Sequence, residues 1–214
     1  MKSGLHSLNG LRVPWILQNL NEEDASVVDV GCGGGLLSIP LARAGLRVTG
    51  IDATEGAVNA ARDALKSRPL QIAGVSDRIT YHCATVESFS EEHEDEFDAV
   101  VASEIVEHVA DLDAFVGGCA RLAKPGAPLF FTTINRTLAS RVLAIWVAEN
   151  VVKVVPRGVH QYEKFVEPRE LTELLERHGC NVRVINGFMY NPFTNHWSWC
   201  RSTAVNYGCL AIKN

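Results

Sequence analysis

The chain has 214 residues, 47% of them hydrophobic, so it can bury one substantial core, and we expect a single domain over residues 1–214. A net charge of −5 with no block of Lys and Arg argues against a nucleic-acid partner. The six cysteines are scattered and form no CxxC pair, which disfavours a zinc ribbon or a disulfide framework.

Short apolar runs alternate with helical patterns over the first two thirds of the chain. We expect strands at 27–30, 47–51, 79–83, 97–102 and 128–134, and helices at 36–44, 54–66 and 111–124. Strand and helix repeated in this way predict an α/β fold, with a parallel sheet covered by helices on both faces.

The pattern changes towards the C-terminus. A short helix at 170–178 precedes two strand patterns, 181–185 and 205–212, that have no helical pattern between them. These two strands predict an antiparallel hairpin that closes a mostly parallel, seven-stranded sheet.

An apolar helical segment is inserted after the fifth strand, at about 137–165, and its helix is expected at 138–155. Arg141, Glu149 and Lys153 fall on one third of its circumference. A membrane-spanning helix is disfavoured, because each charge at mid-bilayer costs about 2.5–3.5 kcal/mol. Two interpretations stay open: a helix of the core, or an interfacial helix that lies on a membrane or lines an apolar substrate channel.

A glycine-rich loop lies where the first strand is expected to pass into the first helix. Gly31 and Gly33 would let the backbone approach a ligand closely, and Asp52, at the end of the second strand, could accept both hydroxyls of a ribose. A dinucleotide fingerprint would require glycine where Leu36 stands, whereas Asp29 suits the cationic methionine end of S-adenosylmethionine. The loop therefore favours S-adenosylmethionine as cofactor.

The stretch SEIVEH follows the fourth expected strand and contains three ionisable side chains. On a helix, Glu104 would share a face with Glu107 and His108 at the carboxyl end of that strand, where open α/β sheets bind ligands. Such a set could hold a divalent ion, with Mg²⁺ or Mn²⁺ favoured and Zn²⁺ admitted by the imidazole. From the residues alone, an acid–base pair and a solvated helix start remain alternatives.

Four stretches together resemble the class I S-adenosylmethionine-dependent methyltransferases, which have a Rossmann-like fold: VVDVGCGGGLLS, VTGIDA, FDAVVASEIVEHV and LAKPGAPLFFTTIN. Residues 8–14, 155–158 and 190–193 are similar more narrowly to the ubiquinone-biosynthesis O-methyltransferase family, and the tail at 197–199 resembles its animal mitochondrial members. Members normally have residues upstream of the position of Met1, so the resemblance implies an N-terminally trimmed chain.

The resemblance also implies roles for individual residues. Cofactor contacts fall on Arg12, Gly31, Asp52 and Ser103, with Asp29, Gly33 and Ala53 as further candidates, and the metal and catalytic positions fall on Glu104, Glu107 and His108. Residues 190–193 are assigned to packing in a substrate pocket.

The implied reaction is methylation of a catechol hydroxyl on a polyprenyl dihydroxybenzoate and on demethylubiquinol. A divalent ion would stabilise the phenolate, or His108 would take the proton as general base. The implied setting is the matrix side of the mitochondrial inner membrane, as a peripheral protein among other ubiquinone-biosynthesis proteins, with a bacterial setting second. Two alternatives stay open: a methyltransferase for a soluble small molecule, and a non-catalytic cofactor-binding component of a complex.

Overall fold

The computed structural model describes residues 4–20, 22, 24–135 and 165–214. Its strands are β1 (Ser26–Val30), β2 (Arg47–Asp52), β3 (Ile79–Cys83), β4 (Ala99–Ser103), β5 (Pro128–Ile134), β6 (Cys180–Asn191), β7 (His196–Cys200) and β8 (Asn206–Lys213). Its helices are α1 (Gly4–Gln18), α2 (Ser38–Arg43), α3 (Glu55–Leu65), α4 (Arg68–Ile72), α5 (Val86–Glu92), α6 (Leu112–Leu122) and α8 (Pro168–Arg177), with a 3-10 turn η1 (Ser76–Arg78).

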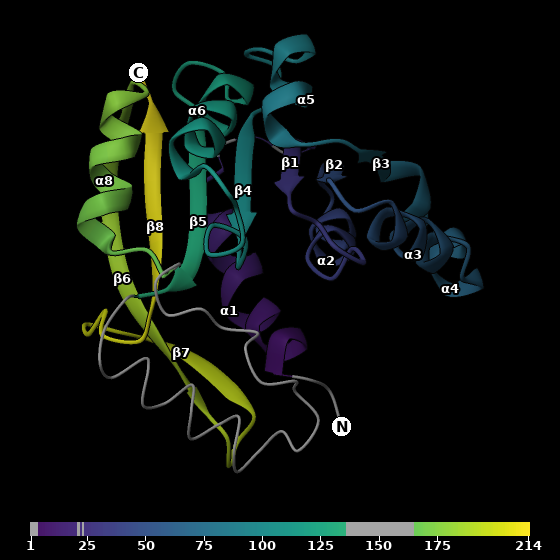
Figure 1. Cartoon of the computed structure of the whole chain (residues 1–214). Helices are drawn as coiled ribbons and strands as arrows, with labels where there is room; N and C mark the ends of the chain where they lie inside the picture. Colours follow the sequence, from purple (N-terminus) through teal and green to yellow (C-terminus); the bar gives the residue numbers. More distant parts are fainter. Residues whose placement is uncertain (1–3, 21, 23, 136–164) are drawn as a thin grey trace.

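The strands form one sheet in the order β3-β2-β1-β4-β5-β8-β6-β7 (Figure 1). The first five strands along this order are parallel, and β8, β6 and β7 are antiparallel to their neighbours. The predicted α/β class is confirmed, because short apolar strands linked by helices can be joined in parallel only by crossing a face of the sheet.

The predicted antiparallel pairing of 181–185 with 205–212 is confirmed, because β6 pairs with β8 over these residues, but the predicted number of strands needs correction. The described sheet has eight strands, because β6 continues well past the expected 181–185 and turns back into β7. Phe188 pairs with Trp199 and Tyr190 with Trp197 across this hairpin. Cross-strand aromatic pairs stabilise two strands that lack a long apolar run, so composition alone did not reveal β7.

Alternate residues of the strands enter two separate cores. Val28 of β1 packs in the core beneath α5, α6 and α8, whereas Val27 packs in the core beneath α1, α2 and α3. Successive side chains of a strand point to opposite faces of the sheet, so a strand that is buried on both faces contributes to both cores. The prediction of helices on both faces is confirmed.

The N-terminal helix α1 was not anticipated as an element. Its apolar residues are spread around the helix, because it packs against α2 as well as β7. The indole of Trp15 lies edge-on to Phe130 at 5.0 Å and to Trp199 at 5.1 Å, and Ile16 is buried. Through α1 the chain delivers Arg12 to the sheet.

The predicted helix at 138–155 lies outside the described residues, as does nearly all of the expected insertion. Within the described ranges, no helix is long and apolar enough to cross a membrane.

Candidate cofactor site and acidic pair

The glycine loop leaves β1 and is held against the end of β2 by its own backbone. The amides of Gly31 and Cys32 both donate to the carbonyl of Ile51, at 2.8 and 3.0 Å. Gly31, Gly33 and Gly35 all have positive φ, a conformation that side chains disfavour. The helix that follows begins at Ser38 rather than at residue 36, so the loop is longer than predicted.

At two of these positions glycine is required because a Cβ would clash with a neighbour, as well as because φ is positive. A Cβ on Gly31 would lie 2.6 Å from Cγ1 of Ile105, and one on Gly35 would lie 2.2 Å from the hydroxyl oxygen of Tyr81. Ile105 belongs to the SEIVEH stretch. The glycine loop and the acidic stretch are therefore in direct contact.

Asp52 lies at the carboxyl end of β2, as predicted, and its carboxylate organises the loop. Oδ2 accepts a hydrogen bond from the amide of Gly33 at 3.0 Å, and Oδ1 accepts one from the amide of Thr54 at 2.8 Å. Ala53, the neighbouring candidate, is exposed at the same edge of the sheet. Asp52 and Gly33, two of the predicted cofactor contacts, therefore lie next to each other.

Asp29 is buried in β1 behind the loop. Ser38 donates its hydroxyl hydrogen to Oδ2 of Asp29 at 2.6 Å. Burial raises the pKa of Asp29 to about 6, although the Ser38 hydroxyl and the charge of Arg12 oppose the rise. The carboxylate is therefore a buried support of the loop, which the sequence alone did not indicate.

Arg12 reaches the same edge from α1. Its guanidinium is buried and donates to Oγ of Ser103 at 2.5 Å and to Oδ1 of Asn9 at 2.6 Å. Burial lowers the pKa of Arg12, while Glu104 and Asp29 act in the opposite direction. The structure thus brings together Arg12 and Ser103, which are far apart in the sequence.

Sequence reasoning missed three polar contributors. Asn9 also donates to the carbonyl of Leu36 at 2.7 Å, which fastens α1 to the glycine loop. Thr132 of β5 shares a hydrogen bond with Ser103, and Thr133 donates to Oε2 of Glu107 at 2.8 Å. Two threonines near the end of an otherwise apolar strand were the available signal, since buried polar side chains need partners.

The SEIVEH stretch is not helical, so the expected shared helix face is wrong. Glu104 has φ of 55° immediately after β4, the amide of His108 closes a turn on the carbonyl of Ile105 at 2.8 Å, and the next helix begins at Leu112. His108 is exposed while Glu107 is buried. No group of three or more His, Cys, Asp or Glu side chains in the described ranges is arranged to hold a metal ion.

The carboxylates of the half-buried Glu104 and the buried Glu107 nevertheless form an interacting acidic pair. Burial raises the pKa of Glu104, the nearby Glu107 raises it further, and Arg12 opposes both effects. Burial also raises the pKa of Glu107, against the hydrogen bond from Thr133. Within the described part of the chain, the buried Oε1 of Glu104 has no hydrogen-bond partner. A carboxylate with one buried, unpartnered oxygen beside a second carboxylate can take up a proton or a cation.

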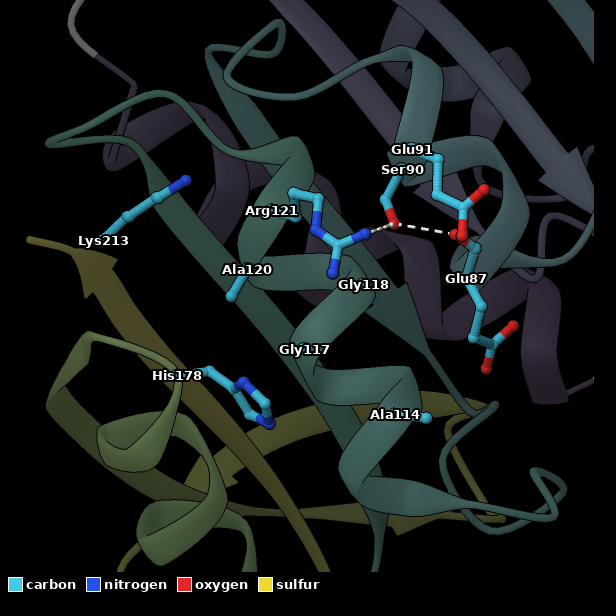
Figure 2. Close-up of a pocket in the computed structure, with 10 residues that line it drawn as sticks. All are labelled: Glu87, Ser90, Glu91, Ala114, Gly117, Gly118, Ala120, Arg121, His178 and Lys213. Atoms are coloured by element: carbon cyan, nitrogen blue, oxygen red, sulfur yellow. Dashed lines mark hydrogen bonds between the residues drawn. The ribbon is translucent and has the colours of Figure 1, made fainter.

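A surface hollow of about 350 Å³ lies elsewhere, between α5, α6 and α8 (Figure 2). Its rim includes Arg121, His178 and Lys213, and Gly117 of α6 leaves room for the His178 ring. None of the predicted site residues lines this hollow.

Comparison with known proteins identifies the family to which the chain belongs. The methyltransferase domain family matches residues 7–184. The ubiquinone biosynthesis O-methyltransferase of Aromatoleum aromaticum is 40% identical over 95% of this chain and 84% of its own length, and that of Sinorhizobium fredii is 40% identical over 98% and 86%. The chain belongs to the ubiquinone biosynthesis O-methyltransferase family. The predicted family is thus confirmed.

Animal members of the family are longer than this chain. The mitochondrial enzyme of Homo sapiens is 42% identical over 98% of the chain, which spans 59% of the human protein's length. Among solved structures, the magnesium protoporphyrin IX methyltransferase of Synechocystis aligns with a TM-score of 0.69 at 20% identity, covering 99% of this chain and 84% of its own. A protein described as a SAM-dependent methyltransferase from Methanosarcina mazei also gives 0.69, at 21% identity over 92% of this chain and 96% of its own. These structures establish the Rossmann-like methyltransferase fold.

Proposed function

We propose that the chain is an S-adenosylmethionine-dependent O-methyltransferase that methylates a catechol hydroxyl of polyprenylated ubiquinone precursors, a polyprenyl dihydroxybenzoate and demethylubiquinol. Family membership over nearly the whole chain carries the proposal. The contact between the glycine loop, Asp52 and the acidic stretch supports it, because the cofactor and the group that receives the methyl must lie side by side.

The cofactor would lie across the carboxyl edge of the sheet. Asp52 would accept the ribose hydroxyls, in exchange for the hydrogen bonds it now receives from the amides of Gly33 and Thr54. Gly31 and Gly33 would permit close approach of the backbone, with Ala53 beside them, and Asp29, Arg12 and Ser103 would hold the loop and the end of β4 in place. S-adenosylmethionine supplies an electrophilic methyl group bonded to a sulfonium.

The acidic pair would serve the substrate. A catechol oxygen attacks the methyl group well only as a phenolate, and an unperturbed phenol has a pKa of about 10. Glu104 and Glu107 lie beside the loop with raised pKa values, so without a bound cation an ionised member of the pair would accept the hydroxyl proton more readily than an ordinary carboxylate. The exposed His108 is the alternative base.

The proposal includes a bound divalent cation, preferably Mg²⁺, and one observation supports it. Glu104 has an unpartnered buried oxygen and lies beside Glu107, and a hard cation would neutralise this pair of carboxylates. Such a cation would also lower the pKa of a catechol bound to it. Glu104 and Glu107 would hold it, with His108 as the third candidate ligand. Removing the cation with EDTA should then abolish methylation and Mg²⁺ should restore it. Unchanged activity in EDTA, with loss on His108→Ala, would assign the proton to the imidazole.

Calorimetric titration of S-adenosylmethionine tests the cofactor half of the proposal. Asp52→Ala should weaken binding at least about tenfold, since it removes the acceptor for two hydroxyl donors. Glu104→Ala should leave affinity nearly unchanged while impairing turnover. Binding of NADH in place of S-adenosylmethionine would refute the assignment.

The proposed setting is peripheral, at the matrix face of the mitochondrial inner membrane, in company with other ubiquinone-biosynthesis proteins. The animal relatives are named mitochondrial, and the bacterial relatives have a similar sequence identity to this chain. The bacterial inner membrane is therefore the second candidate setting. A polyprenyl tail stays in the bilayer, because each CH₂ moved into water costs about 0.8 kcal/mol. The enzyme must therefore meet its substrate at a membrane surface.

A further inference from the structure

Within the described residues, buried polar atoms that lack a hydrogen-bond partner are concentrated at the carboxyl edge of the sheet. There are four such side-chain atoms, and three of them lie at this edge: Nε of Arg12, Oε1 of Glu104 and Oδ1 of Asn135. The predicted packing of residues 190–193 inside a substrate pocket is wrong for Phe193, which is 98% exposed. A polar lining for the substrate has to be sought at the carboxyl edge instead, where Asn135 has no role so far.

Asn135 follows directly after β5 and is held in place by two hydrogen bonds. Its backbone amide donates to the carbonyl of Val205 at 2.7 Å, which continues the pairing of β5 with β8 by one residue. Its side-chain nitrogen Nδ2 donates to the carbonyl of Thr203 at 2.7 Å. Only 6% of the residue is exposed. The side chain is therefore buried and fastened to the segment that leads into β8.

The side-chain oxygen Oδ1 of Asn135 has no partner in the described part of the chain. The orientation of the amide follows from its other half, because the carbonyl of Thr203 only accepts and must face the nitrogen. Leaving a buried acceptor unpaired is unfavourable, and such atoms are uncommon in folded proteins. A donor that arrives with a ligand would remove this cost.

Asn135 lies on the same face of the sheet as the contact that holds the acidic pair. Thr133, two positions earlier, donates to Oε2 of Glu107 at 2.8 Å. Side chains two positions apart along an extended strand point to one face and start about 7 Å apart. A catechol has its two hydroxyls on neighbouring ring carbons, so it can present one hydroxyl to the acidic pair and the other to Asn135.

We propose that Oδ1 of Asn135 accepts a hydrogen bond from the catechol hydroxyl adjacent to the one that is methylated, and that this bond selects catechols over phenols with a single hydroxyl. The reacting hydroxyl loses its proton and receives the methyl group, whereas its neighbour keeps its proton and shares it with Asn135. A site built to bind a hydroxyl discriminates strongly against an analogue that lacks it, because the polar group of the site is then left unpaired. The inference rests on the proposed function, since it takes a catechol as the substrate.

Calorimetric titration of substrate analogues into the complex with S-adenosylhomocysteine tests the proposal. The probes are a short-tailed prenyl dihydroxybenzoate and two analogues that each lack one of its hydroxyls, with EDTA present so that no cation contributes. The wild type should bind the catechol at least about tenfold more tightly than the analogue without the hydroxyl that faces Asn135. Asn135→Ala should weaken binding of the catechol and of one analogue about tenfold, and leave binding of the other analogue unchanged.

Asn206→Ala is the matched control. Asn206 also donates its side-chain amide to a backbone carbonyl, that of Phe188 at 3.4 Å. It pairs with Ile134 across the strands, however, and so faces the side of the sheet opposite to Asn135. Asn206→Ala should bind all three probes as the wild type does. The affinity for S-adenosylhomocysteine should be the same in the wild type and both variants, which excludes a general loss of structure.

Equal weakening of all three probes by Asn135→Ala would assign the residue a structural role and overturn the proposal. Equal binding of the catechol and both analogues by the wild type would overturn it too, and this result decides even where Asn135→Ala does not fold. Loss of Mg²⁺ affinity in Asn135→Ala, with catechol binding in EDTA unchanged, would assign Oδ1 to a cation and would also overturn it. Absence of methyl transfer to the catechol by the wild type would instead count against the proposed function, while the three binding constants would still decide the role of Asn135.

Discussion

At the scale of single residues, the cost of replacing a glycine of the loop depends on which atoms a new Cβ would meet. Gly33 and Gly35 both have positive φ, at 52° and 80°. Only Gly35 faces a neighbour, since nothing lies within 4 Å of a Cβ built on Gly33. The two positions therefore separate backbone strain from steric overlap.

Gly35→Ala should destabilise the protein more than Gly33→Ala. Backbone strain costs about 1–2 kcal/mol in either variant, and Gly35→Ala adds the overlap with the Tyr81 hydroxyl. Urea unfolding without ligand measures both. In the Gly35→Ala background, Tyr81→Phe should recover part of the loss, because it removes the atom at 2.2 Å. No recovery would mean that strain alone sets the cost.

Asp29 should make stability depend on pH in the mildly acidic range. Its folded pKa of about 6 lies above the ordinary 3.8, so ionisation is easier in the unfolded chain. Stability is therefore greatest below pH 4 with respect to this group and falls as the pH rises through 6, by roughly 3 kcal/mol. Asp29→Asn, which keeps an acceptor for Ser38, should lack this component. Parallel curves for the two proteins between pH 4 and 7 would contradict it.

At the scale of elements, α1 is the piece whose removal should affect both fold and site. It buries Ile16 against the sheet and carries Arg12 and Asn9 to the carboxyl edge. Packing of the helix and order of the loop should therefore be linked, although their residues are far apart in the sequence.

Ile16→Ala should cost about 2–5 kcal/mol, because it leaves a cavity in a buried site. Gln18→Ala, at an exposed position of the same helix, should change stability by less than about 0.5 kcal/mol. Thermal or urea unfolding distinguishes the two variants. A comparable loss of stability in both would contradict the claim that the buried face of α1 sets its contribution to stability.

At the scale of the whole molecule, cofactor binding should stabilise the fold by mass action, since a ligand that binds only the folded state adds its binding free energy. S-adenosylhomocysteine at 100 times its Kd should add about 2.7 kcal/mol, which raises Tm by roughly 5–10 °C for a chain of this size. With its Kd raised about tenfold, Asp52→Ala should show only about half of that shift at the same concentration, because the stabilisation falls to about 1.4 kcal/mol. An equal shift in Asp52→Ala would place the ligand elsewhere.

The sequence by itself determined the parallel sheet, its strand positions and the glycine loop with Asp52, because these depend on local periodicity and on residues next to one another in the chain. It also indicated the family, through motifs at strand ends. Only the tertiary structure decided that SEIVEH is a turn with Glu104 at positive φ, since the packing of Ile105 on Gly31 overrides its helical pattern. It also decided that α1 fastens the loop through Asn9 and that Phe193 faces outward, because side-chain partners and exposure depend on residues distant in sequence.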